Sequence, residues 1–211
     1  MDSDYLRKFY REKRTANKVA IIGGGKSLDG VDFDKMKRHN QIICVNDAWR
    51  GFRDPHSVFS IDCSEVHKRF HDCPYDIYLA ATYHLHVTNS ISHRCFLRMD
   101  NPCLSEERYA IHHNENSGFG AFNFAYHFRP QYIFLFGIDL VNMGTYWHDH
   151  SDIRIQKDHV HATIPSKFNM TMRQIKKAGI SVFNCSPISA IDCFRKVTPE
   201  YGVDLWNRLE E

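Results

Sequence analysis

The residues best suited to chemistry form a glycine-rich turn near the start of the chain. Gly23, Gly24 and Gly25 follow a short apolar run and precede Ser27. Glycines let the backbone approach a phosphate without a Cβ clash, so its N–H groups can donate to the phosphate oxygens, and a serine hydroxyl adds another donor. The spacing matches neither the G-x-x-x-x-G-K-[ST] phosphate loop nor the complete G-x-G-x-x-G of dinucleotide folds. The turn therefore predicts nucleotide binding, with a purely structural strand-to-helix turn as the alternative.

Polar residues also follow other apolar runs, at the point where each run ends. Carboxyl ends of parallel strands meet at one edge of a sheet, so these residues predict a polar site beside the glycine turn. Taken singly, each Asn or Asp is also an ordinary turn former. Asn116-Ser117-Gly118 has two equal interpretations, a helix cap or a set of donors for a ligand. The remaining positions are Asn46 with Asp47, Asp62, Asp139 after Gly137-Ile138, and Asn184-Cys185-Ser186-Pro187.

The apolar runs that end at these positions have the length of buried strands, and helical patterns separate several of them. Alternation of this kind predicts an α/β fold, a Rossmann-like and mostly parallel sheet with helices on both faces. Residues 83–115 are irregular, which indicates either a functional segment or short hidden elements. The expected strands lie at 19–22, 42–45, 57–61, 76–80, 132–136 and 180–183, and the main expected helices at 118–128 and 166–178.

A chain of 211 residues suits one domain of ordinary size. We expect residues 19–211 to form a single nucleotide-binding domain, after a basic N-terminal arm or helix over residues 1–18. The segment near 140–166 is rich in polar and aromatic residues, and we expect it to close over the site as a lid.

Composition restricts the partners and the compartment. A net charge of +2 argues against general attraction to nucleic acid or an anionic bilayer, although the basic arm keeps a polyanionic acceptor open. No apolar run approaches the roughly 20 residues of a membrane-spanning helix. Seven cysteines without paired C-x-x-C spacing favour reduced thiols in a cytoplasmic protein.

A histidine-rich stretch over residues 148–161 has the ligand types of a zinc or manganese site. His159 and His161 are two residues apart, however, and that spacing is not the spacing of a helical metal site. We therefore interpret the stretch as a surface loop and predict no metal site.

The order of these motifs resembles the small bacterial sialyltransferases of Campylobacter type. More loosely, the turn resembles pterin diphosphokinases and proteins of unknown function that share a G-x-G-x-S-L sequence. Residues 19–28 look like the first strand and turn of the sialyltransferase family, and residues 44–46 look like its second strand tip. Residues 116–118 look like its Thr-Ser-Gly motif, residues 136–140 like its Ser-Gly-Ile-Asp-Phe motif, and residues 185–189 like its Cys-Pro-Asn-Ser motif.

The resemblance implies an inverting glycosyltransferase that takes a sugar, sialic acid in the family, from a cytidine monophosphate (CMP) sugar without a metal ion or other cofactor. The glycine turn, Asn46, Ser117 and Gly118 would bind the donor. His161 would match the lid histidine that acts as general base, and Tyr146 a lid tyrosine that holds the leaving phosphate. The family's tetramers imply self-association as well.

Two departures from the family pattern leave the donor sugar open. Val141 stands in place of a second lid tyrosine, and Gly24 in place of an asparagine that reaches the donor. One alternative is Mg²⁺-dependent phosphoryl or diphosphoryl transfer, with the ion on Asp47, Asp62 or Asp139. Another is a nucleotide-binding protein without turnover. The sequence does not identify the acceptor of the sugar.

Overall fold

A parallel β-sheet forms the centre of the fold. The computed structural model describes residues 16–61, 70–81, 93–99, 101–107, 110–141, 147 and 158–209. The strands in this part of the chain are β1 (Lys18–Ile22), β2 (Gln41–Val45), β3 (Ser57–Ser60), β4 (Ile77–Ala81), β5 (His93–Met99), β6 (Ala110–His112), β7 (Tyr132–Phe136), β8 (Ser181–Cys185) and β9 (Arg195–Lys196). Within these residues the nine strands follow the order β6-β5-β4-β3-β2-β1-β7-β8-β9, and every neighbouring pair is parallel.

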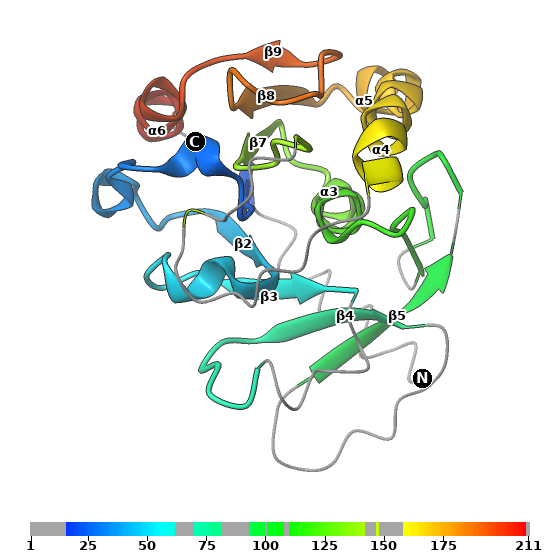
Figure 1. The fold of residues 1–211 in the computed structure, drawn as a ribbon, viewed down its shortest axis with the longest axis horizontal. Coiled ribbons are helices and arrows are strands. Elements are labelled where there is room, and N and C mark those ends of the chain that lie inside the picture. The colour runs from blue at the N-terminus through cyan, green and yellow to red at the C-terminus, as the bar shows by residue number, and fades with distance from the viewer. Residues whose placement is uncertain are drawn as a thin grey trace.

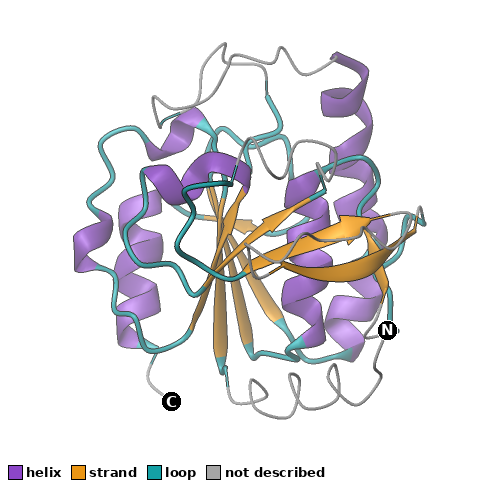
Figure 2. Cartoon of the chain, turned by 90° about the horizontal axis from the view of Figure 1, so that it is seen from below, coloured by secondary structure: helices purple, strands orange, loops and turns teal. Residues whose placement is uncertain are grey.

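Helices cover both faces of the sheet (Figures 1 and 2). One face carries α3 (Ser117–His127), α4 (Asp158–Met170) and α5 (Met172–Lys177), and the other carries α6 (Pro199–Arg208). Three short 3-10 turns connect the early strands: η1 (Lys26–Leu28), η2 (Phe33–Lys35) and η3 (Asn46–Arg50). This arrangement confirms the predicted α/β fold with a parallel sheet and helices on both faces.

The central strand β1 is buried along its whole length, because both of its faces are covered. Val19 and Ile21 point into the core beneath α3, whereas Ala20 and Ile22 point into the core beneath α6. A strand covered on both sides reads as a continuous apolar run rather than as an alternating pattern. The run from Val19 to Ile22 is therefore the buried strand that its pattern predicted.

Residues 83–115 contain two strands that had no clear sequence pattern. β5 pairs with β4, and β6 extends the sheet beyond β5. α4 also begins at Asp158, earlier than the expected start at Ser166, so it includes the end of the expected lid segment. α6 was not among the expected helices, and Thr198 caps it by accepting from the N–H of Tyr201 at 3.3 Å.

The expected boundary between arm and domain at residue 18 falls inside the sheet. Lys18 is the first residue of β1, is only 6% exposed, and donates from Nζ to the carbonyl of Trp206 at 2.9 Å. It therefore fastens β1 to the end of α6 instead of belonging to a solvated arm. Residues 1–15 lie outside the described residues. None of the described helices is both long and apolar enough to cross a membrane.

Candidate functional site

The candidate site lies where β1 and β7 meet. Strands β2 to β6 extend from one side of β1, while β8 and β9 extend from the far side of β7. The order of the strands thus reverses between β1 and β7, and their carboxyl ends lie next to each other. Ligands of open α/β sheets bind outside the carboxyl ends of the strands at such a switch point.

The glycine turn after β1 contacts the backbone at the end of β7. The Gly23 N–H donates to Phe136 O at 2.7 Å, and the Gly25 N–H donates to Gly137 O at 2.9 Å. A Cβ at Gly23 would lie 2.4 Å from Gly137 O, and one at Gly25 would lie 2.4 Å from the Asp139 carboxyl group. Gly23 and Gly25 are therefore needed because the two chain segments approach so closely.

Asp139 and Ser27 hold the two ends of the strands together. Asp139 is only 4% exposed. Its Oδ2 accepts from the Ser27 N–H at 2.9 Å and its Oδ1 from the Ser27 hydroxyl at 2.6 Å. The donors of Gly23, Gly25 and Ser27 are thus satisfied within the protein. The N–H of half-buried Gly24, in contrast, has no acceptor within the described part of the chain.

The start of α3 lies beside this turn. Asn116 caps the helix, because its Oδ1 accepts from the Phe119 N–H at 2.9 Å, which confirms the capping interpretation. The Ser117 hydroxyl accepts from the Ile61 N–H at 3.4 Å, and a Cβ at Gly118 would lie 3.2 Å from Ile138. The start of α3 therefore lies between the ends of β3 and β7. Among the described residues, the backbone N–H groups of Ser117 and Gly118 have no acceptor.

Asn46 completes the described part of the site at the end of β2. Its φ of 53° is in the left-handed region, which asparagine tolerates better than most residues. Its Oδ1 accepts from the Ser60 hydroxyl at 2.8 Å, so Asn46 links the ends of β2 and β3. The structure thus brings together the glycine turn, Asn46, the start of α3 and Asp139.

Three predicted site residues lack a described side chain. Asp62 and Tyr146 lie outside the described residues. His161 lies in the first turn of α4, and its side chain is outside the described part.

The direction of α4 follows from two contacts. Phe168 packs against Phe119 at the start of α3, with ring centroids 5.1 Å apart. Further along, Gln174 of α5 reaches Glu106, which also binds Tyr126 near the end of α3. The pair α4 and α5 therefore runs in the same direction as α3. The first turn of α4, which precedes Phe168 by two turns, lies beyond the start of α3.

The chain shares the fold of a bacterial sialyltransferase. The sialyltransferase CstII from Campylobacter jejuni, in complex with the substrate analogue CMP-3FNeuAc, matches with a TM-score of 0.50 and 13% identity over 88% of each chain. A structure of CST-II with a trisaccharide acceptor and CMP has a TM-score of 0.47 at 13% identity, over 88% of this chain and 87% of that one. No protein-family model and no curated protein sequence matches the chain. At this identity the likeness to the sialyltransferase is a likeness of fold.

Trp147 is a component of the site that the sequence did not reveal. Trp147 donates from its indole N–H to Gly23 O at 2.8 Å, and from its backbone N–H to Gly24 O at 3.2 Å. Trp147 also packs against Phe33. The sequence contained no signal for its hydrogen bonds, because both acceptors are backbone carbonyls distant along the chain.

The cysteines near the site do not have the properties of nucleophiles. Burial raises the pKa of the Cys44 and Cys185 thiols well above their ordinary value, so both stay protonated. Both belong to the core beneath α6. Among the described residues, no group of three His, Cys, Asp or Glu side chains is arranged to bind a metal ion.

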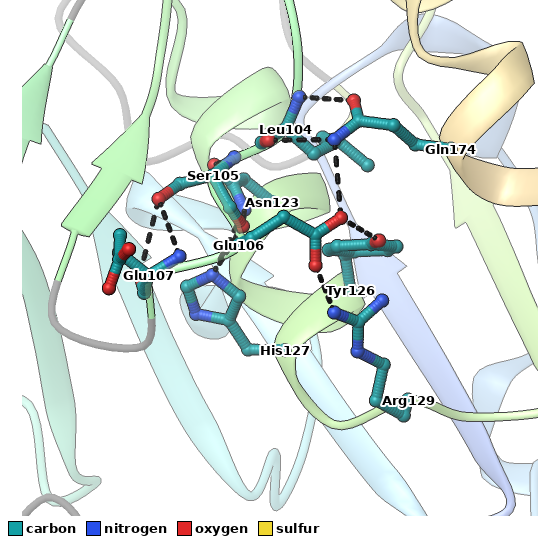
Figure 3. Close-up of polar contacts among 9 residues, drawn as sticks. All are labelled: Leu104, Ser105, Glu106, Glu107, Asn123, Tyr126, His127, Arg129 and Gln174. Carbon is teal, nitrogen blue, oxygen red and sulfur yellow. Dashed lines mark hydrogen bonds and ion pairs between the residues drawn. The ribbon is translucent and has the colours of Figure 1, made fainter. Parts of the chain in front are cut away.

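A second cluster of polar residues lies beside the C-terminal half of α3 (Figure 3). Asn123 binds Ser105 through both ends of its amide, and the Nε2 of His127 lies 2.9 Å from the Ser105 carbonyl. Glu106 accepts from Tyr126 at 2.6 Å and also from Arg129. Because these groups satisfy one another, the cluster fastens residues 101–107 to α3 and carries no reactive side chain.

Proposed function

We propose that the protein is a glycosyltransferase-like enzyme that takes a sugar from a nucleotide-sugar bound at the β1–β7 switch point. The observation that carries the proposal is the meeting of the glycine turn, Asn46 and the start of α3 at this edge of the sheet. The fold shared with a sialyltransferase supports a CMP-sugar, such as CMP-sialic acid, as the donor.

The donor phosphate would bind between the glycine turn and the start of α3. The N–H groups of Gly24, Lys26, Ser117 and Gly118 are backbone donors there without acceptors in the described part of the chain. The N-terminal end of a helix also carries partial positive charge, which favours an anion. Backbone donors of this kind can bind a phosphate without a metal ion, so we propose a metal-independent reaction.

The chemistry would need a base for the acceptor hydroxyl, and His161 is our candidate. As the acceptor oxygen bonds to the donor carbon, His161 would take the hydroxyl proton. The bond from that carbon to the CMP phosphate oxygen breaks, and its electron pair leaves with CMP. Tyr146 would hold the leaving phosphate. The first turn of α4 lies beyond the start of α3, which is compatible with a base above the bound donor.

A binding experiment tests the proposal before any acceptor is known. We expect CMP and CMP-sialic acid to raise the melting temperature of the protein equally with EDTA and with Mg²⁺, because a ligand of the folded state stabilises it. A shift that requires ATP or GTP together with Mg²⁺ would instead indicate phosphoryl transfer. If no nucleotide shifts the melting temperature, the glycine turn is purely structural and the proposal is wrong.

Turnover tests the base separately from binding. Release of CMP from CMP-sialic acid, with water as the acceptor, should fall about 100-fold in His161→Ala while CMP affinity stays unchanged. The matched control is His39→Ala, since His39 is exposed in the turn that precedes β2 and should keep full activity. Equal rates in the two variants would remove His161 from the mechanism. Binding of CMP without any turnover would indicate a nucleotide-binding protein.

A further inference from the structure

Trp147 is attached to the glycine turn at two consecutive carbonyls. Its indole Nε1–H donates to Gly23 O at 2.8 Å, and its backbone N–H donates to Gly24 O at 3.2 Å. The half-buried indole also packs against Phe33, with ring centroids 5.8 Å apart. Phe33 in turn packs against Phe52 and Phe136 in the core beneath α6. The indole is thus held from the core side and reaches the turn with a fixed geometry.

These two bonds determine how the peptide groups of the turn are oriented. In a trans peptide the C=O and the following N–H point in opposite directions, and the described residues contain no cis peptide. The carbonyl of Gly24 points to Trp147, and the N–H of Gly25 points the other way, to Gly137 O. The carbonyl of Gly23 also points to Trp147, so the N–H of Gly24 must point away from it.

The peptide between Gly23 and Gly24 needs such a restraint. Neither residue has a Cβ, so rotation of this peptide meets little steric resistance. The neighbouring peptide is held from both sides, by Trp147 and by Gly137. For the Gly23–Gly24 peptide, the described residues provide one bond, which is the bond from the indole to Gly23 O. Loss of the indole donor would leave the Gly24 N–H without a fixed direction.

We infer that Trp147 is a positioning residue of the nucleotide site, which aims the Gly24 N–H at the ligand phosphate. The inference rests on the proposed function, because it requires a phosphate-bearing ligand at this turn. Trp147 need not touch the ligand itself. Its effect is expected on phosphate binding, since the indole binds the backbone of the glycine turn.

Trp147→Phe tests the inference, because phenylalanine keeps an aromatic ring against Phe33 and lacks the N–H donor. We expect the variant to bind CMP about tenfold more weakly, or about 1.4 kcal/mol, and to bind cytidine with unchanged affinity. Isothermal titration calorimetry with both ligands measures this ratio. A merely structural role would weaken both ligands equally, and that result would overturn the inference.

The matched control is Trp206→Phe. Its indole donates to a backbone carbonyl, Lys37 O, at 2.9 Å, and the ring packs in the core beneath α6. This control removes the same type of bond far from the turn, and should leave the ratio of CMP to cytidine affinity at its wild-type value. An equal change in both variants would also overturn the inference.

Wild-type protein provides a second measurement that needs no variant. With ¹⁵N-glycine labelling, the Gly24 amide proton should move downfield on addition of CMP and should stay in place with cytidine. Binding of CMP without movement of the Gly24 signal would overturn the inference and leave the proposed function standing. Failure of wild-type protein to bind CMP would overturn both.

Discussion

At the scale of single residues, the bond between Asp139 and Ser27 determines the shape of the site. The Asp139 carboxylate accepts both donors of Ser27, and it occupies the space that a side chain at residue 25 would need. Asp139 therefore acts as a brace between the turn after β1 and the turn after β7. Because Asp139 is only 4% exposed and both of its oxygens face Ser27, we expect it to shape the nucleotide site without binding the nucleotide.

Asp139→Ala should lower the free energy of unfolding by about 2–3 kcal/mol, because it removes two hydrogen bonds to a buried charged acceptor. Asp139→Asn should lose less than half of that. Its amide oxygen can still accept from the Ser27 N–H, and the Ser27 hydroxyl can turn to accept from the new NH₂ group. Urea unfolding measures both variants.

Asp29→Ala is the control for this pair. Asp29 follows the same turn but is 53% exposed, and its ion pair with Lys26 is a surface pair. Such pairs contribute about 0–1 kcal/mol, so the control should stay near wild type. If Asp139→Ala were as stable as Asp29→Ala, Asp139 would not brace the site.

The sequence predicted the position of the glycine turn, but it could not show which N–H groups of the turn are hydrogen-bonded within the protein. The run Gly23-Gly24-Gly25 predicted a close backbone approach, and the structure contains one. The partners of Gly23 and Gly25 are backbone carbonyls after β7, and local sequence carries no information about such distant acceptors. Which N–H group stays available to a ligand therefore became visible only in three dimensions.

At the scale of elements, the polar cluster of Figure 3 replaces the regular pairing that residues 101–107 lack. Asn123 is fully buried in α3, and its Oδ1 accepts from the N–H groups of both Ser105 and His112. Gln174 binds the N–H and the carbonyl of Leu104 from the other side. Two side-chain amides thus provide this segment with the backbone hydrogen bonds that a neighbouring strand provides elsewhere in the sheet.

Asn123→Ala should destabilise the protein by about 2–4 kcal/mol, since two backbone N–H groups would lose their acceptor in the interior. Gln174→Ala is the matched comparison, because it removes two bonds to the same segment from a partly exposed position where water can replace them. Its cost should be about 1 kcal/mol. Equal losses in the two variants, measured by thermal unfolding, would show that burial of Asn123 adds nothing.

The strands that were clearest from the sequence are those buried on both sides. β1, β2 and β7 are continuous apolar runs, and their type and position were clear. β5 contains Arg94 and Arg98, and its charged residues conceal a strand that lies near the edge of the sheet. α6 buries Gly202, Val203 and Trp206 at helical spacing, and Thr198 followed by Pro199 is a usual helix start, so its pattern was present in the sequence and was overlooked.

At the scale of the whole molecule, the sheet separates two apolar cores, and one of them buries two cysteines whose reactivity depends on how well that core is closed. Cys44 and Cys185 lie in the core beneath α6, and burial raises the pKa of both thiols well above the ordinary value. Cys185 even lies where a side chain at Gly202 would have to go. The fold thus holds both thiols neutral and out of contact with solvent.

Cysteine labelling tests this packing. With iodoacetamide at pH 8, exposed Cys103 should react within minutes, while Cys44 and Cys185 should react only after the protein unfolds. Peptide mass spectrometry distinguishes the three sites. Rapid labelling of Cys44 in folded protein would show that this core opens readily.

The same two thiols predict how stability depends on alkaline pH. Their folded-state pKa is raised, so folded protein keeps these protons at a pH where the unfolded thiols, with an ordinary pKa of about 8.5, already lose them. The contribution to stability is therefore complete below about pH 8.5 and declines as the pH rises further. Urea unfolding at pH 7.5 and pH 9.5 should show a lower free energy of unfolding at the higher value. Conversion of both cysteines to alanine should reduce this difference.

The contact between the ends of β1 and β7 also affects the rate of folding. Ser27 and Asp139 are 112 residues apart, so the segment between them must be brought into place before their bond can form. Long-range contacts of this kind pay loop-closure entropy before they gain any stability, and they slow folding. A chain emerging from the ribosome therefore has its glycine turn long before it has a nucleotide site. Recovery of nucleotide binding during refolding should lag behind the recovery of secondary structure, which makes the ligand a probe of the last steps of folding.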